Sequence, residues 1–533
     1  MSEGGGRDPK DSGDVVEERN LADRPEMGEV TERERVSTRA WVGRFAGPVL
    51  ALVVYLLLPS GEGGLSPEGQ VVVAVGLLMA VWWVTEALPL PATALLPIVL
   101  FPLFGAVEIG DATAPYASDT IFLFMGGFMI ALAMQRWGLH RRIALFTILA
   151  VGTKPVRVIG GFMLATAFLS MWVSNTATAV MMLPIGLSVL ALVLTDGERS
   201  GGSGAEEDAS RFTGAGASNF AVCLMLGIAY AASIGSLATL IGTPPNLFMA
   251  GFLQETYDIT IGFGQWMAVG LPLSAVFLFV SWIVLTRFVY PPEIEEISGG
   301  RELIRGEIEE MGGISRGEKV VLAIFVTTAF FWIFRQPLSG LPGLGGLEDA
   351  GIAIAAAVLL FAIPVDWRNG VFALDWRTAL RLPWGVLLLF GGGLSLASAV
   401  SATGVDEWIG DRFGGLAGIP TLLFVVAVTV AVIFLTELTS NTATAAALLP
   451  IFGGVAVGVD LDPLLLVVPA ALAASCAFML PVATPPNAIV FGSGHVTILQ
   501  MVRAGVWLNV IAILLITLAV YGLASWALGL TLA

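Results

Sequence analysis

The residues best suited to chemistry in this 533-residue chain belong to two motifs that each occur twice. Ser-Asn-Thr-Ala-Thr-Ala occupies 174–179 and again 440–445, and both copies run on into Leu-Pro-Ile. A Thr-Pro-Pro-Asn motif follows each copy, at 243–246 and 484–487. A glycine-rich stretch precedes each copy of the Ser-Asn-Thr motif, around 126 and around 392, and the number of residues between stretch and motif is the same in both cases. This ordered repetition indicates two homologous halves.

The motifs offer neutral ligands for ions. A Ser-Asn-Thr turn between two half-helices would present carbonyl oxygens on one side and unpaired N–H groups, with a positive dipole end, on the other. Carbonyl and amide oxygens suit a small hard cation such as Na⁺, whereas N–H groups, Asn amides and Thr hydroxyls suit a carboxylate. No Lys or Arg lies in the four breaks or their apolar limbs. Anion binding there is therefore expected to depend on cations.

The composition is that of a polytopic membrane protein. Hydrophobic residues make up 56% of the chain and charged residues 13%, against the roughly 25% charge of soluble domains. The lipid bilayer is thus an expected partner. The net charge of -16 comes mostly from the tail and loops, and it predicts no macromolecular partner, nucleic acid included. Residues 1–40 are polar and are expected to form a disordered, acidic cytoplasmic tail.

Several classes of active site are not expected. The histidines, His140 and His495, and the cysteines, Cys223 and Cys476, are few and widely separated, which argues against a zinc, disulfide or His-based catalytic site. A Gly-rich Lys-Ser/Thr nucleotide motif is missing, which argues against an ATP-driven pump. We therefore expect neither an enzyme nor an organic cofactor.

Four segments are too short or too interrupted to be simple spanning helices. Each limb of 158–192 has about 16 residues, or ~24 Å, which is less than the ~30 Å of a hydrocarbon core. This stretch and 420–456 are predicted to be re-entrant hairpins, and 219–250 and 463–492 to be helices broken at the prolines. The fold class is therefore all-α, with about 11 transmembrane segments; the remaining spans are expected near 41–59, 70–88, 90–106, 120–135, 264–287, 319–336, 349–366, 384–400 and 504–528.

Charge distribution fixes an expected orientation. With the N-terminus in the cytoplasm, only Arg335 and Arg412 of the 26 basic residues would be external. The C-terminus would then be external, and five crossings would separate the two hairpins. An odd number inverts the second half, and inverted repeats with broken helices are typical of secondary transporters. We expect the plasma (inner) membrane as the location.

The paired motifs resemble those of the divalent anion/sodium symporter family, which includes di- and tricarboxylate and sulfate carriers. The segment at 85–97 shares this resemblance; it reads Thr-Glu-Ala-Leu-Pro-Leu-Pro-Ala-Thr-Ala-Leu-Leu-Pro. The resemblance covers about 41–530. It implies a homodimeric elevator transporter with scaffold segments at 41–157 and 319–400, transport-domain segments at 158–290 and 401–533, and a cytoplasmic linker at 291–318.

The same resemblance implies the site residues. One sodium site resembles a set made of Ser170, Ser174, Asn175 and Gly242. The second resembles a set made of Thr436, Thr439, Asn441 and Ala483. Substrate carboxylates would meet the tip residues Asn175, Thr176, Asn441 and Thr442, with Thr243, Thr484 and Pro485 nearby.

The leading hypothesis is a symporter importing a dicarboxylate, such as succinate, malate or fumarate, with two or more Na⁺. Alternatives are a sodium-independent dicarboxylate exchanger, a sulfate or tricarboxylate carrier of the same fold, an anion channel or, least favoured, an intramembrane enzyme. The sequence ranks neither the anions nor the stoichiometry. It also leaves open the roles of the tail and of the insert at 196–218.

Simpler interpretations stand beside these. Asn and Thr in membrane helices often only bond a neighbouring helix, and paired prolines can be kinks. The glycine-rich stretches are expected to serve close packing. Glu437 could couple protons or balance charge, but pairing with a polar neighbour inside its hairpin is favoured. Glu86 and Trp266, near segment ends, are expected at the membrane interface.

Overall fold

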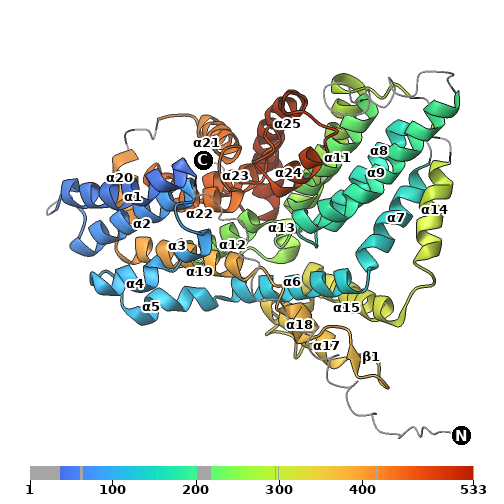
Figure 1. The fold of residues 1–533 in the computed structure, drawn as a ribbon. Coiled ribbons are helices and arrows are strands. Elements are labelled where there is room, and N and C mark those ends of the chain that lie inside the picture. The colour runs from blue at the N-terminus through green and yellow to red at the C-terminus, as the bar shows by residue number, and fades with distance from the viewer. Residues whose placement is uncertain are drawn as a thin grey trace, which may run out of the picture.

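The structure is a computed structural model that describes residues 37–60, 64–152, 154–200, 218–294, 296–297, 299–413, 415 and 418–531. Most of the predicted acidic tail and of the 196–218 insert lie outside the described residues. The fold is helical, as predicted, with one small departure (Figure 1). Strands β1 (Pro364–Asp366) and β2 (Val371–Phe372) form a short antiparallel hairpin.

The first half of the chain begins with a group of helices that the sequence assigns to the scaffold: α1 (Thr38–Leu57), α2 (Pro67–Thr85), α3 (Leu90–Thr93), α4 (Leu96–Leu103), α5 (Ile109–Thr113), η2 (Ala114–Ala117) and α6 (Asp119–Arg136). After α7 (Leu139–Val151), the hairpin and broken-helix region follows: α8 (Pro155–Ser170), α9 (Asn175–Ser200), α11 (Asn219–Ser236), α12 (Pro244–Tyr257), α13 (Phe263–Ile283) and its continuation η4 (Val284–Val289).

The second half repeats this order after a connecting helix: α14 (Gly300–Glu310), α15 (Arg316–Ile333), α16 (Arg335–Ser339), α17 (Asp349–Ala362), α18 (Trp376–Ala379), α19 (Trp384–Ala402), α20 (Val405–Phe413), α21 (Thr421–Thr436), α22 (Asn441–Gly458), α23 (Leu464–Ala474), α24 (Pro485–Gly492), α25 (Ile498–Ala519), η6 (Val520–Ala524) and α26 (Ser525–Ala527). Within the described ranges, nine helices are long and apolar enough to cross a membrane, and five apolar helices are shorter.

Two predicted lengths are wrong. The span expected at 90–106 is divided into α3 and α4, because Pro91 and Pro97 each start a new helical turn. The second limb of the first hairpin, α9, has 26 residues rather than about 16, whereas the first limb, α8, has 16. The stretch of α9 that is apolar enough to cross a membrane ends at Val193, whereas the helix continues to Ser200, so the apolar pattern predicted only part of this helix.

The two broken helices form the centre of the bundle. Every residue from Phe220 to Ser236 in α11 is buried, and so is all of α23. Helix α11 lies beside both limbs of the first hairpin, α8 and α9 (Figure 1). After each break the chain restarts as a helix with two prolines in its first turn, where their missing N–H groups cost no helical hydrogen bond. The prolines thus position the breaks in the protein interior.

The glycine-rich stretches lie where helices approach closely, as predicted. A Cβ atom on Gly126 of α6 would lie 2.6 Å from the backbone of Ala353 in α17. On α19, a Cβ on Gly392 would lie 2.2 Å from the carbonyl oxygen of Ala94. Such distances exclude any side chain unless the backbone moves.

We expect Gly392→Ala to destabilise the protein by about 1–3 kcal/mol, because the added methyl group meets backbone rather than a movable side chain. The matched control is Gly351→Ala on α17, where a Cβ would have no neighbour within 4 Å. Thermal unfolding in detergent should give a lower midpoint for the first variant only. Equal midpoints for the two variants would contradict the close-packing role.

Candidate functional site

The two hairpin tips lie around one cavity of about 900 Å³. Between α8 and α9 the first tip occupies 171–174, and between α21 and α22 the second occupies 437–440. The predicted site residues that line the cavity are Ser174, Asn175, Thr176, Gly242, Thr243, Thr439, Asn441, Thr442, Ala483, Thr484 and Pro485. Ser170 and Thr436 do not line it; they are fully buried directly behind the tips.

The first tip contains a group of three oxygen atoms, which we call the first oxygen cluster. The Ser170 hydroxyl lies 2.7 Å from the Asn175 side-chain oxygen and 2.6 Å from the Ala232 carbonyl oxygen. The Asn175 amide nitrogen donates to the Ser236 hydroxyl at 3.3 Å, which orients the amide with its oxygen toward Ser170. Hairpin and broken helix thus meet through these oxygens.

The second tip repeats the arrangement as the second oxygen cluster. The Thr436 hydroxyl lies 2.8 Å from the Asn441 side-chain oxygen and 3.0 Å from the Ala474 carbonyl oxygen. A hydroxyl carries one proton, so in each cluster two acceptors compete for a single donor. Three oxygens with one proton retain unused lone pairs, and that is the chemistry of a hard-cation site. Ala232 and Ala474 could not be predicted from the sequence, because every residue type carries a main-chain carbonyl.

Both breaks in the broken helices are held by the Asn that ends the Thr-Pro-Pro-Asn motif. The amide of Asn246 donates to the carbonyl of Thr239 at 3.0 Å, and that of Asn487 donates to the carbonyl of Leu480, also at 3.0 Å. Both side chains are fully buried. The shared Asn is therefore a brace for the unwound backbone, which a simple proline kink would not need.

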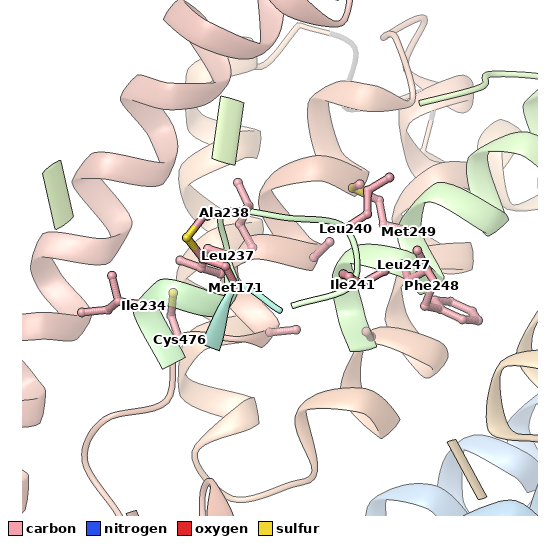
Figure 2. Packing of buried hydrophobic residues seen from close by; sticks show 14 of the residues in the cluster. Met171, Ile234, Leu237, Ala238, Leu240, Ile241, Leu247, Phe248, Met249 and Cys476 are labelled. Atoms are coloured by element: carbon pink, nitrogen blue, oxygen red, sulfur yellow. The ribbon is translucent and has the colours of Figure 1, made fainter. Parts of the chain in front are cut away.

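Around the first break, apolar side chains close the structure. Leu237, Ala238 and Ile241 follow the bend, with Met171 and Cys476 beside it (Figure 2). Trp266, predicted at the membrane interface, is instead fully buried, and its indole N–H donates to the Leu237 carbonyl at 3.1 Å. It satisfies a carbonyl that the break leaves without a helical partner.

The other predicted hydroxyl groups differ in their contacts. The Ser174 hydroxyl accepts from the Ala177 N–H at 3.3 Å, and the Thr484 hydroxyl accepts from the Asn487 N–H at 3.3 Å, so each caps a helix. Thr243 pairs with the Ser475 hydroxyl at 3.2 Å, which joins the two broken helices. Thr439 contacts the Thr444 hydroxyl at 2.6 Å. Thr176 is exposed and Thr442 is half-buried, and both line the cavity.

The sequence of this chain is similar to those of known proteins. The family model described as "Sodium:sulfate symporter transmembrane region" matches residues 38–530. The chain belongs to this sodium:sulfate symporter family. It is 43% identical over 491 residues to the sodium-dependent dicarboxylate transporter SdcS of Staphylococcus saprophyticus, covering 92% of both chains. It is 41% identical over 501 residues to SdcS of Staphylococcus aureus, covering 94% of both.

Solved structures support the fold alone. The Alcanivorax borkumensis YdaH transporter matches with a TM-score of 0.54 at 12% identity, over 91% of this chain and 99% of that one. MtrF of Neisseria gonorrhoeae matches with a TM-score of 0.54 at 13% identity, over 84% and 98%. These matches confirm the predicted fold class.

Glu437 contacts the second broken helix, which the sequence did not predict. The buried carboxyl group of Glu437 accepts hydrogen bonds from the N–H groups of Phe478, Met479 and Leu480 at 2.7 to 3.2 Å, and from the Asn509 amide at 2.8 Å. The expected partner inside the hairpin is wrong, since these donors come from the second broken helix and α25. Every partner is a donor, which suits the ionised carboxylate.

Charged side chains also reach the cavity from outside the motifs. Arg39, Glu86 and Arg381 line it, although no basic residue lies in the breaks themselves. Glu86 is thus a cavity residue as well as an exposed one. Among the described residues, no group of three His, Cys, Asp or Glu side chains could hold a metal ion. Any cation at the tips would depend on neutral oxygens.

We expect Glu437→Gln to destabilise the protein by about 2–3 kcal/mol, because an amide cannot accept from three backbone N–H groups and its own N–H₂ faces them. A lower thermal unfolding midpoint in detergent would measure this loss. Glu309→Gln, an exposed acid on α14, is the control and should unfold near the unmodified midpoint. An unchanged midpoint for the Glu437 variant would show that the carboxylate does not brace the second break.

Proposed function

We propose that this protein is a secondary active symporter that moves a dicarboxylate dianion together with at least two Na⁺. The two oxygen clusters carry the proposal, because each gathers three oxygens around one proton and both lie behind tips that face the same cavity. The related SdcS proteins are named as sodium-dependent dicarboxylate transporters, in agreement with this chemistry.

One cation would bind in each half. In the first half the ligands would come from the first oxygen cluster together with Ser174 and Gly242. In the second half they would come from the second oxygen cluster together with Thr439 and Ala483. Because no acidic side chain is among these ligands, Na⁺ would be held weakly by either half alone and more firmly once an anion is present.

The dianion would lie between the tips. The Asn175-Thr176 pair begins α9 and the Asn441-Thr442 pair begins α22, so each tip directs N–H groups and a helix dipole at the cavity. Thr243, Thr484 and Pro485 would border the substrate, although two prolines at each restart leave fewer N–H donors there. A dianion facing neutral donors requires the neighbouring cations for charge balance.

Purified protein in liposomes should accumulate labelled succinate when a Na⁺ gradient is imposed, and should not when choline or K⁺ replaces Na⁺. Thr436→Val should raise the Na⁺ concentration for half-maximal uptake by about 3- to 10-fold, since losing one neutral ligand costs about 1 kcal/mol. Uptake that needs internal substrate rather than Na⁺ would identify an exchanger and reject coupling. Sulfate or citrate added in excess would reveal a different preferred anion by competition.

The two halves differ in how they meet the rest of the protein, which supports alternating access. Trp172 and Ile241 of the first half are 8% and 7% exposed, and Ile241 packs over Gly127 of α6. Their counterparts in the repeated motifs, Leu438 and Val482, are 61% and 81% exposed. Both line the cavity, as does the buried Ile241, whereas Trp172 does not. Exposed apolar side chains in a water-accessible cavity are costly. We infer a second conformation in which Leu438 and Val482 are covered and the first pair is exposed.

An elevator motion in a homodimer fits this exchange. The scaffold would comprise 41–157 and 319–400, with the transport domain at 158–290 and 401–533 and the linker at 291–318. Helices α7 and α20 would connect the two bodies, and each follows a glycine with positive φ, Gly138 at 71° and Gly404 at 70°. Such glycines permit a sharp turn at both connections. Insertion in the plasma (inner) membrane with a cytoplasmic N-terminus and an external C-terminus is part of this proposal.

Cysteine accessibility tests the two conformations. Val482→Cys should react with a membrane-impermeant maleimide applied to one face of the membrane. Trp172→Cys, whose position does not line this cavity, should react only with reagent applied to the other face. The unmodified protein is the control, since Cys223 and Cys476 are both buried. Reaction of both variants from the same face would contradict the exchange of roles between the halves.

A further inference from the structure

The charged groups of the cavity are few and come from outside the hairpin tips. Among the described residues that line it, only Arg39, Glu86 and Arg381 carry charge. Arg39 is near the start of α1 and Glu86 follows α2, whereas Arg381 lies between α18 and α19. Glu86 and Arg381 therefore lie within the proposed scaffold ranges, and Arg39 belongs to α1, the helix with which the first of these ranges begins.

Two of these charges compensate each other. The guanidinium group of Arg39 lies 4.0 Å from the Glu86 carboxylate. It also donates to the main-chain carbonyl of Leu438 at 3.2 Å and to that of Val84. Arg39 is thus committed to contacts at the edge of the second tip, and the pair adds no net charge to the cavity.

Arg381 is different. Its side chain is exposed, and it forms no hydrogen bond or ion pair with any other residue that the structure describes. The acidic residue closest to Arg381 in the sequence, Asp375, is already paired with Arg136 at 2.7 Å. Arg381 therefore gives the cavity one uncompensated positive charge. A guanidinium group stays protonated at any physiological pH, so this charge is permanent.

The repeat gives Arg381 no charged counterpart among the described residues. At the 266-residue offset that relates the two hairpins, the counterpart of Arg381 is Pro115, a buried and uncharged residue. An opposite cavity, formed when the two halves exchange roles, would lack an equivalent cation at that position. The repeated motifs give the two tips the same residues. Arg381, in contrast, would give the cavity on one face of the membrane a positive charge that the cavity on the other face lacks at that position.

We propose that Arg381 is a positioning residue that attracts the dicarboxylate dianion into the cavity on its own face of the membrane, without being a ligand in the bound state. The inference rests on the proposed function. A fixed charge at a cavity entrance raises the local concentration of an oppositely charged solute, by about 3- to 10-fold for a single charge and a dianion, at the low end of electrostatic steering. The neutral tips then take over the substrate.

The test compares both faces of the membrane. Right-side-out and inverted vesicles containing the unmodified protein, Arg381→Gln or Arg381→Lys would be assayed for the succinate concentration that gives half-maximal Na⁺-dependent transport. Arg377→Gln is the matched control, because Arg377 is an exposed neighbour on α18 that does not line the cavity. Each assay would be run at about 0.1 M and about 1 M ionic strength, where the Debye length falls from ~10 to ~3 Å.

Arg381→Gln should raise the half-saturating succinate concentration about 3- to 10-fold on one face at low ionic strength and leave the other face unchanged. The difference should disappear at high ionic strength, and Arg381→Lys should behave like the unmodified protein. Equal effects on both faces, or no effect on either, would overturn the proposal. An effect that persists in high salt and is not rescued by Lys would indicate a direct ligand or lipid contact instead, and would overturn it as well. Failure of the unmodified protein to transport would reject the proposed function first, so the two failures are distinguishable.

Discussion

In each half, one hydroxyl group links the Asn of the hairpin tip to a main-chain carbonyl of the broken helix, and the candidate site depends on this contact. The Ser170 hydroxyl lies between the Asn175 amide oxygen and the Ala232 carbonyl, and Thr436 occupies the same place in the other half. Because one proton cannot satisfy both acceptors, the contact leaves lone pairs directed at one place. An interaction that helps to hold the tip in position therefore also prepares it for a cation.

The two halves are alike in the site and unlike around it. Their oxygen clusters contain the same three kinds of group, at 2.6–2.7 Å in the first half and 2.8–3.0 Å in the second. An Asn at the same motif position braces each break. Outside the clusters, Glu437 stands where the first half has Met171, and Val482 is exposed where Ile241 is buried. Two identical chemical sites in one rigid surrounding would bind ions but would not open alternately. Different surroundings allow one half to be packed against the scaffold while the other is open.

The sequence was sufficient for the features that are encoded in side chains. Prolines at 244–245 and 485–486 define the breaks, and Asn175 and Asn441 mark the tips, so their position around one cavity could be predicted from the repeated motifs. The carbonyls of Ala232 and Ala474 could not, since any residue supplies a carbonyl. The arginines in the cavity were missed because they are distant from the motifs in the chain. The division of 90–106 and the length of α9 were missed because hydropathy records composition and not where a helix ends.

The absence of basic residues from the breaks has a consequence for transport. If two Na⁺ accompany a dianion, the tips have the same net charge empty and loaded, so a membrane potential would favour neither state by itself. Glu437 does not change this balance, because its carboxylate is already met by four donor groups and needs no cation. A fixed arginine at the tips would instead leave the empty site positive and costly to move through a low-dielectric region. Compensation by mobile ions lets the anion and cations depend on each other, and that dependence is what couples them.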